Sequence, residues 1–569
     1  MSPSRLTRPR FKRSKSLIAV AAAALLALSA CSSGGDSGSG TESNGSSSTG
    51  TQAAGDPVSG QTLTWALEKS PVTLNPQQNS QDGFVFVLRN YADSYLYLND
   101  KGEYEPWLAE SYTQSDDRLD LTLKLREGVT FSDGEVLNAD AVVANFDYLT
   151  SDKNPSLPEW NSALKGYEKV DDYTVTFHLN QVEPTFLDAL STVKTSPISP
   201  KSLTSAKSLE AGGPDVAFVG AYTIKSYTEG NELVLEKNPS YKWDEWGPTE
   251  LAKANPGAPY ADEQIFRILP EAATRTGALT SGQVDVIYGV PAQDVALFDT
   301  DQYAYGQVLN SGTVYSLYLN TTKAPFDDIR IRQALQKGVD YDAVVDSVYY
   351  GNGTVAKQWF SPASIFSNED FDSAVTFDKD AANKLLDDAG WTKRDSDGYR
   401  TNAAGEKLTI VVNADAPYIR DSRDILFQAI VAEAKDNLGV DFQFQALDPG
   451  TVTTSWQDNK NDAFDNSMGS TDISTSLDLL IPAWDPPRIF IGQDPEAVKL
   501  ITSAKEASTT EERKTFYNQL QDYVVNEKAY IVPLYVTRDN WAADKDIQNI
   551  LVSEISGHIF STTTAWRAE

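Results

Sequence analysis

The side chains that could do chemistry are unevenly represented in this chain, which has 80 aspartates and glutamates but two histidines and one cysteine. Two carboxyl groups at a suitable separation can hydrolyse a glycan by acting as acid and base. Adjacent acids occur at Asp116-Asp117, Asp171-Asp172, Asp327-Asp328 and Asp387-Asp388. Neighbouring acids on a surface point in different directions, so these pairs alone do not predict an active site.

Other catalytic patterns are missing from the sequence. Histidine and cysteine supply most nucleophile and base pairs, and both are scarce here. The sequence contains no zinc-protease helix motif, nucleophile elbow or phosphate-binding loop. We therefore predict a protein that is not an enzyme and needs no cofactor, with a hydrolase acting on glycans as the alternative.

The same scarcity limits metal binding. Direct coordination of nickel would favour histidine, cysteine or methionine, and beyond the first 31 residues the chain offers only His178, His558 and Met468. His178 falls on the polar side of the alternating segment Val175 to Leu179, which predicts a solvated imidazole. We predict no metal site, although a metal held inside a chelating small molecule stays possible.

The first thirty residues have the order of a secretion signal. Its charged start contains Arg5, Arg8, Arg10, Lys12, Arg13 and Lys15. The apolar run at residues 17–28 is shorter than the ~20 residues that a membrane-spanning helix needs. The run ends in Leu28-Ser29-Ala30-Cys31, which resembles the bacterial lipoprotein box. This resemblance implies that residues 1–30 are removed and that Cys31 carries the acyl chains that anchor the protein to a membrane.

Residues 31–60 are mostly Ser, Gly, Thr, Asn and Ala, a composition typical of a flexible tether. The formal net charge of the chain is −32. Such an acidic balance argues against nucleic acid and against anionic lipid surfaces as partners. We expect a monomer.

Two periodicities run through the rest of the chain and predict a mixture of strands and helices, so the fold class is α/β or α+β. Alternating leucines at 119–125 and alternating apolar residues at 175–179 predict antiparallel strands with one wet face. Asn138 can cap a helix over residues 139–149, and Asp378 can cap another that stops at Gly390. Helical spacing continues at residues 425–438 and 516–524, before an apolar strand at 530–536.

Blocks spread over about residues 61–541 resemble the solute-binding proteins of peptide, dipeptide and nickel ABC importers, a group known as extracellular solute-binding proteins of family 5. The most specific run is 107–112 (WLAESY), 123–134 (LKLREGVTFSDG) and 137–142 (LNADAV). It is followed by 220–222 (GAY), 236–241 (EKNPSY), 278–285 (ALTSGQVD), 319–321 (LNT) and 325–335 (PFDDIRIRQAL). Residues 382–390 and 513–534 resemble the later helices and the closing strand of the family.

The resemblance implies an α/β fold of two lobes that close over a ligand, joined by two crossing segments near Tyr318 to Thr321 and Pro533 to Thr537. Lobe 1 would span residues 61–317, with an extra subdomain at about 102–213. Lobe 2 would span 318–536, and residues 537–569 would return to lobe 1. Closure around a ligand is a common way to signal binding to a partner.

The resemblance also implies where a ligand would bind. Peptide-binding members hold the ligand's ammonium with an aspartate that follows a Phe-Asp segment, and here Phe464-Asp465 precedes Asp472. The tryptophan and the Tyr-Asp-Pro ending common in that loop are absent from this chain. Aromatic residues that could face the cleft by analogy are Tyr91, Tyr418, Trp456 and Trp484, and the loop after the first strand adds Asn79, Gln81, Asp82 and Phe84.

Together these features imply a lipid-anchored binding protein on the outer face of the cytoplasmic membrane. It would capture a small solute and deliver it to the permease and ATPase of an ABC importer. A short peptide is the solute that the resemblance favours. The alternatives are an exported glycan hydrolase, a binding protein for a metal chelate or other non-peptide solute, and a chemoreceptor or adhesin that reuses the fold.

Overall fold

In the computed structural model, the described residues are 55–78, 81–152, 154, 158–481 and 489–569. The expected signal segment, Cys31, most of the tether, Asn79 and Trp484 therefore lie outside the described residues. The described chain has two large hydrophobic cores: one built from residues 63–308 and 541–566, the other from residues 315–535. We call the parts around these cores lobe 1 and lobe 2. Among the described helices, none is long and apolar enough to cross a membrane.

The main sheet of lobe 1 has seven strands in the order β12-β20-β11-β1-β10-β9-β8. β1 pairs in parallel with both β10 and β11, and Trp65 on β1 is fully buried. The strand bounds are β1 Gln61–Leu67, β8 Tyr222–Thr228, β9 Glu232–Lys237, β10 Ala261–Ile268, β11 Val286–Tyr288, β12 Tyr303–Leu309 and β20 Arg538–Asp544. Because β12 and β20 pair side by side, the chain leaves and re-enters lobe 1 at neighbouring strands.

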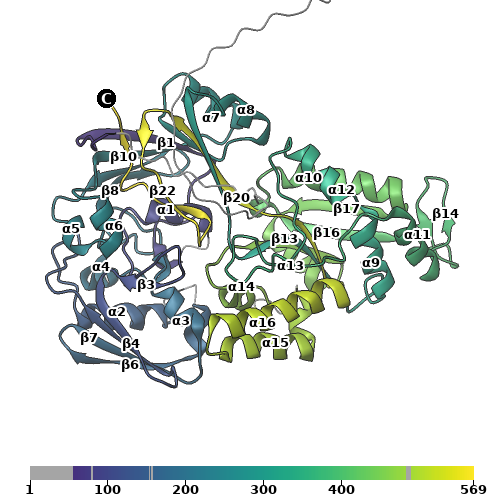
Figure 1. The fold of residues 1–569 in the computed structure, drawn as a ribbon, viewed down its shortest axis with the longest axis horizontal. Coiled ribbons are helices and arrows are strands. Elements are labelled where there is room, and N and C mark those ends of the chain that lie inside the picture. Colours follow the sequence, from purple (N-terminus) through teal and green to yellow (C-terminus); the bar gives the residue numbers. More distant parts are fainter. Residues whose placement is uncertain (1–54, 79–80, 153, 155–157, 482–488) are drawn as a thin grey trace, which may run out of the picture. The chain divides into compact units, whose positions relative to one another are not determined.

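A second sheet of lobe 1 has the order β4-β5-β7-β6, with β4 Ala109–Gln114, β5 Asp120–Leu125, β6 Leu164–Asp171 and β7 Thr174–Leu179. Helix α2 (Ala139–Leu149) lies beside it (Figure 1) and begins at Asn138, whose side chain accepts from Ala141 N. The two predicted strands and this cap are confirmed. The predicted subdomain at about 102–213 contains these elements, but its apolar residues belong to the same core as β1.

Shorter elements complete lobe 1. The helices are α1 Val85–Leu88, α3 Pro184–Ala189, α4 Pro200–Ser205, α5 Trp243–Trp246, α6 Thr249–Ala254, α7 Ala272–Thr280 and α8 Val295–Phe298. The strands are β2 Leu96–Leu98, β3 Tyr104–Pro106, β21 Ile547–Gln548, β22 Leu551–Ser553, β23 His558–Ser561 and β24 Trp566–Arg567. Short 3-10 turns lie at η1 Pro76–Gln78, η2 Asp82–Phe84, η3 Glu159–Ser162, η4 Val193–Thr195 and η5 Ala292–Asp294.

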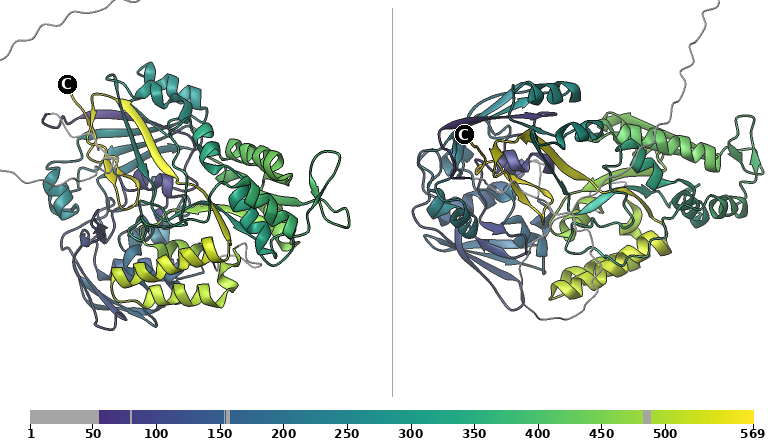
Figure 2. Two further views of the ribbon diagram at one scale, coloured as in Figure 1. Left: turned by 45° about the vertical axis from the view of Figure 1, so that its right-hand side comes forward. Right: turned by 45° about the horizontal axis from the view of Figure 1, so that its top comes forward.

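Lobe 2 contains a three-stranded sheet, β18-β13-β19, and the parallel pair β16 and β17. The strands are β13 Thr313–Leu319, β14 Lys393–Arg394, β15 Arg400–Thr401, β16 Thr409–Asp415, β17 Asp441–Leu447, β18 Ala463–Met468 and β19 Ile531–Tyr535. The helices are α9 Ile329–Gly338, α10 Tyr341–Val348, α11 Lys379–Asp388, α12 Arg423–Glu433, α13 Pro449–Gln457, α14 Ile473–Leu480, α15 Pro495–Glu506 and α16 Thr510–Gln521, with turns η6 Ala416–Tyr418 and η8 Phe490–Gln493. Helices α15 and α16 lie side by side (Figures 1 and 2).

The predicted helices of lobe 2 are confirmed, and two of them extend into π-helical turns. α12 continues as η7 Ala434–Leu438 up to Gly439, and α16 continues as η9 Asp522–Glu527. Asp378 caps α11 by accepting from Ala381 N, as predicted. Local signals in the sequence were sufficient at these places because caps and apolar spacing act within a few residues.

The chain passes between the two sheets at residues 310–312 and 536–537. The crossing segments expected near Tyr318 to Thr321 and near Pro533 to Thr537, and the lobe bounds that follow from them, stay predictions. In the structure Tyr318 and Leu319 are paired within β13. Between β12 and β13 the sequence has the polar run Asn310-Ser311-Gly312, a turn signal at the point where the chain changes sheets.

Candidate functional site

Three adjoining cavities are lined by residues of both lobes. The hinge cavity, of about 230 Å³, adjoins the second crossing segment. The central cavity, of about 100 Å³, shares Glu68, Asp421 and Arg538 with it. The third, of about 120 Å³, meets the central cavity at Gly469 and His558, and we call it the Arg89 cavity. The three form one cleft between the lobes.

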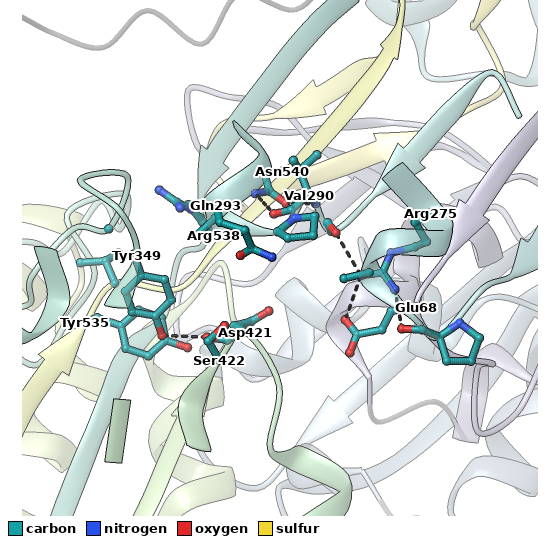
Figure 3. A pocket seen from close by; sticks show the side chains of 17 residues that line it. Glu68, Arg275, Val290, Gln293, Tyr349, Asp421, Ser422, Tyr535, Arg538 and Asn540 are labelled. Atoms are coloured by element: carbon teal, nitrogen blue, oxygen red, sulfur yellow. Dashed lines mark hydrogen bonds and ion pairs between the residues drawn. The ribbon is translucent and has the colours of Figure 1, made fainter. Parts of the chain in front are cut away.

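In the hinge cavity, aromatic and charged side chains of the two lobes face one another (Figure 3). Tyr349 and Tyr535 of lobe 2 lie together with Asp421, whose carbonyl oxygen accepts from the Tyr349 hydroxyl at 2.8 Å. Glu68 and Arg275 lie on the lobe 1 side, 4.0 Å apart between Oε2 and Nη2. Tyr535 ends β19 directly before the crossing segment. A movement of that segment would therefore change the shape of this cavity.

A histidine–aspartate pair stands at the junction of the central and Arg89 cavities. His558 Nδ1 lies 3.0 Å from Asp539 Oδ2, and the Asn310 amide donates to Asp539 Oδ1 at 3.1 Å. Burial alone would raise the pKa of Asp539, but the His558 ring and these hydrogen bonds hold it below its usual value. The pair comes from β20 and β23, so it belongs to the returning C-terminal part of the chain.

The central cavity also collects charges from both lobes. Lys69 follows β1, and burial together with the nearby Arg420 charge lowers the pKa of its ammonium. Arg420 lies 3.5 Å from Asp421, measured from Nε to Oδ2. Side chains of both charges thus line one small cavity, which suits a ligand that carries both signs.

The buried Arg423 contacts three strands of lobe 2: β13, β18 and β19. Its guanidinium lies 4.0 Å from the ring centre of Tyr315 and donates to the Tyr535 hydroxyl at 3.0 Å and to Ser467 Oγ at 3.1 Å. Ser467 lines the central cavity, whereas Tyr535 ends β19. Arg423 therefore links the lining of the central cavity to the strand that leads into the second crossing segment.

The predicted site residues are only partly brought together. Gln81 and Phe84 line the central cavity. Tyr91 is buried in lobe 1, where its hydroxyl donates to Leu74 O at 2.7 Å, and Trp456 packs in lobe 2 against Phe464. Neither is among the described residues that line the three cavities.

Four other predicted residues are not among the described residues that line the cavities. Tyr418 is half exposed, at 51%, and its carbonyl oxygen accepts from Arg423 at 3.2 Å. Asp82 lies in η2. Asn79 and Trp484 are outside the described residues. The roles proposed for these four residues stay predictions.

Asp472 caps α14 by accepting from Ser474 N at 2.8 Å, and Arg513 donates to both of its carboxylate oxygens at 2.7 Å each. Burial would raise the pKa of Asp472, but Arg513 outweighs this effect and lowers it. The carboxylate is thus ionised and already paired. That Asp472 binds a ligand ammonium stays a prediction.

Several residues that line the cleft were not predicted as ligand contacts, among them Arg89, Lys194, Asp421, Asp539 and His558. His558 had one usable signal, since it is one of two histidines in the chain. The other histidine, His178, pairs with Asp120 at 2.6 Å on the strand face predicted to be polar. The described residues contain no group of three or more His, Cys, Asp or Glu side chains arranged to hold a metal ion.

Comparison with known proteins supports this architecture. The profile of the family described as bacterial extracellular solute-binding proteins, family 5 Middle, matches residues 103–484. The chain is 30% identical over 360 residues to heme-binding protein A of Haemophilus influenzae, covering 58% of this chain and 62% of that protein. It is 30% identical over 370 residues to the dipeptide-binding protein of Escherichia coli, covering 59% and 64%. The chain thus matches less than two thirds of the length of these curated relatives.

Among solved structures, NikA from Brucella suis in complex with Fe(III)-EDTA superposes with a TM-score of 0.76 at 23% identity, covering 88% of this chain and 98% of that one. The chain thus has the two-lobed fold of periplasmic binding proteins. The chain belongs to the bacterial extracellular solute-binding proteins of family 5, as the sequence resemblance predicted. Its place is accordingly outside the cytoplasm.

Proposed function

We propose that the protein captures a short peptide in the cleft between its lobes and delivers it to the permease and ATPase of an ABC importer. The observation that carries this proposal is the joint lining of the cleft: Lys69 and His558 come from lobe 1, whereas Arg420 and Asp421 come from lobe 2. A site assembled from both lobes binds best when they are closed, so the ligand stabilises the closed state. The relative from Escherichia coli, named a dipeptide-binding protein, favours a peptide.

We keep Gln81 and Phe84 as ligand contacts and add Lys69, Arg420 and the Asp539–His558 pair. A zwitterionic peptide needs partners for both charges, because a buried charge without a partner is costly. The central cavity offers both. In this proposal the protein encloses its solute without changing it chemically, and it works as a monomer made of residues 61–309 and 538–569 on one side and 313–535 on the other.

We also propose that Cys31 is acylated and anchors the protein to the outer face of the cytoplasmic membrane through the tether at residues 31–60. Two acyl chains suffice for stable anchoring where one is marginal. Replacing Cys31→Ser should release the protein from the membrane fraction into the soluble extracellular fraction, with its ligand affinity unchanged. Retention of this variant in the membrane fraction would contradict the anchor.

The proposal is tested on protein purified without denaturation. Native mass spectrometry should detect a retained peptide, and calorimetry with di- to pentapeptides should give saturable binding. A glycan or chelate in place of the peptide would exclude the peptide assignment. Hydrolysis of an offered glycan or peptide by the pure protein would instead favour the enzyme alternative.

A further inference from the structure

The loop that follows β18 offers a ligand less negative charge than its sequence suggests. Both oxygens of Asp472 accept from Arg513, which also donates to Ser474 Oγ at 2.8 Å and lies 4.8 Å from the ring centre of Phe366. Asp472 is 7% exposed. A ligand ammonium would have to displace a bidentate guanidinium, the strongest kind of partner that a carboxylate finds in proteins.

The adjoining Arg89 cavity has the opposite character. Arg89 is 7% exposed, and its guanidinium lies 5.0 Å from the ring centre of Trp107 and 5.1 Å from that of Phe560. Its hydrogen bonds go to neutral oxygens, Ser94 Oγ and Ser191 O. Among the described residues no carboxylate contacts it, although the charge of the buried Asp93 acts on it from a greater distance, and its Nε has no hydrogen-bond partner. A buried cation without a contacting anion is costly, so an anion in this cavity would be strongly favoured.

Two further side chains of the Arg89 cavity lack partners in the described part of the chain. Lys194, in η4, is half-buried and has no ion pair. Thr475, in the first turn of α14, is 9% exposed, and its hydroxyl has no hydrogen-bond partner. Lys194 comes from lobe 1 and Thr475 from lobe 2, so a group bound between them would touch both lobes.

Negative charge in the same cavity is limited. Among its described lining residues, Asp188 is the one carboxylate, and it accepts from Thr471 Oγ1 at 2.6 Å. His558, which also lines the cavity, pairs through Nδ1 with Asp539 Oδ2. Two cations therefore face one engaged carboxylate, and apolar walls from Val85, Val193 and Ile559 keep the local dielectric low.

We propose that the Arg89 cavity is a carboxylate subsite: Arg89, Lys194 and Thr475 bind the carboxylate end of the solute, and Asp472 takes no part in reading an ammonium. This proposal rests on the solute-binding function proposed above and names the group by which the solute is recognised. For a peptide, that group is the C-terminal carboxylate. The Asp472–Arg513 pair then serves to hold the start of α14, and with it Thr475, in place.

Calorimetry with modified peptides tests the subsite. The probes are di- to tetra-alanine in N-acetylated and in C-amidated form, with succinate as a carboxylate that is not a peptide. We expect the N-acetylated peptides to bind and the amides to bind on the order of 100-fold more weakly, since loss of one partner from a buried charge pair has effects of this size. Binding of the amides but not of the N-acetylated peptides would overturn the subsite while leaving the peptide function intact.

Variants separate the remaining outcomes. Lys194→Met should weaken binding of the carboxylate probes on the order of 10-fold and Thr475→Val about 3-fold, with little effect on the amides. Lys201→Met, an exposed lysine of α4, is the matched control. Succinate binding that is lost in Lys194→Met, without binding of any peptide, would retain the subsite and remove the peptide function. Failure of all carboxylate probes would remove both.

Asp472 itself gives an independent readout. Asp472→Asn leaves Arg513 without its partner and should lower stability, but it should not change the ratio of affinities between free and N-acetylated peptide. A selective loss of affinity for the free peptide in this variant would assign the ammonium to Asp472 and overturn this part of the inference. Arg89 lies in the core of lobe 1, so its replacement is informative only together with the Lys194 and Thr475 variants.

Discussion

At the scale of single residues, Asp465 on β18 has an unusual environment. One carboxylate oxygen accepts from the Tyr315 hydroxyl at 2.5 Å, whereas the other, Oδ1, is buried without a partner. Burial, only partly offset by Tyr315 and the charge of Arg423, raises the pKa of Asp465 to about 6. The carboxyl therefore keeps its proton in the folded protein at a pH where the unfolded chain has lost it.

This raised pKa predicts a pH-dependent stability. Between the unfolded value of 3.8 and about 6, the folded state binds more protons, so the contribution of Asp465 is complete below pH 4 and is lost as the pH rises through 6. The asparagine of the Asp465→Asn variant cannot ionise.

The unfolding free energy of this variant, relative to that of the wild type, should therefore increase by up to about 3 kcal/mol between pH 4 and 7.5. Urea unfolding at several pH values measures this difference. A difference that does not change with pH for Asp465→Asn would refute the shift.

At the scale of elements, the conformation of the loop between β12 and β13 depends on Gly312. Its φ is +92°, and a Cβ there would lie 2.1 Å from Met468 O and 2.7 Å from Ser470 N. The crossing segment thus touches the backbone of the loop that lines the Arg89 cavity. A change in one of these segments must move the other.

Gly312→Ala should accordingly destabilise the protein and weaken ligand binding together. The left-handed backbone conformation alone costs about 1–2 kcal/mol for alanine, and the clash adds to this. Gly128→Ala isolates the first contribution, because Gly128 has φ +77° and nothing within 4 Å of its added Cβ. Denaturant unfolding and calorimetry of both variants provide the comparison. Equal losses of stability, with unchanged affinity in Gly312→Ala, would mean that the close approach is unimportant.

At the scale of the whole described chain, the lobes also touch away from the crossing segments. Lys505 on α15 lies 2.5 Å from Asp478 of its own lobe and 3.3 Å from Glu183 of lobe 1, measured from Nζ to the nearest carboxylate oxygens. Arg118 of lobe 1 donates to the carbonyl oxygens of Glu506 and Ala507 at the end of the same helix. These contacts join the two lobes in the present arrangement, so they stabilise it independently of ligand.

Lys505→Met should therefore shift the ligand-free protein toward open states. The expected results are a larger radius of gyration in solution scattering without ligand and an affinity lowered on the order of 10-fold, because part of the closing free energy is lost. Lys499→Met is the control on the same helix, since Lys499 pairs only with Glu496 among the described residues. Identical scattering curves and affinities for the two variants would show that the Lys505 contact does not bias closure.

Much of the secondary structure followed from the sequence, because its causes are local. The alternation that placed β5 and β7, the cap at Asn138 and the cap at Asp378 act over a few residues, and the structure confirms them. The blocks that resemble family 5 proteins were sufficient to identify the family and the two-lobed fold.

The ligand-facing chemistry could not be obtained in this way. Asp472 gains Arg513 as its partner across 41 residues, and His558 and Arg89 reach one cleft from the two ends of the described chain. Burial and pairing decide what a charge can do, and both depend on contacts between distant segments. The sequence by itself thus determined the class of protein and its elements, whereas only the tertiary structure decided which charges remain available to a solute.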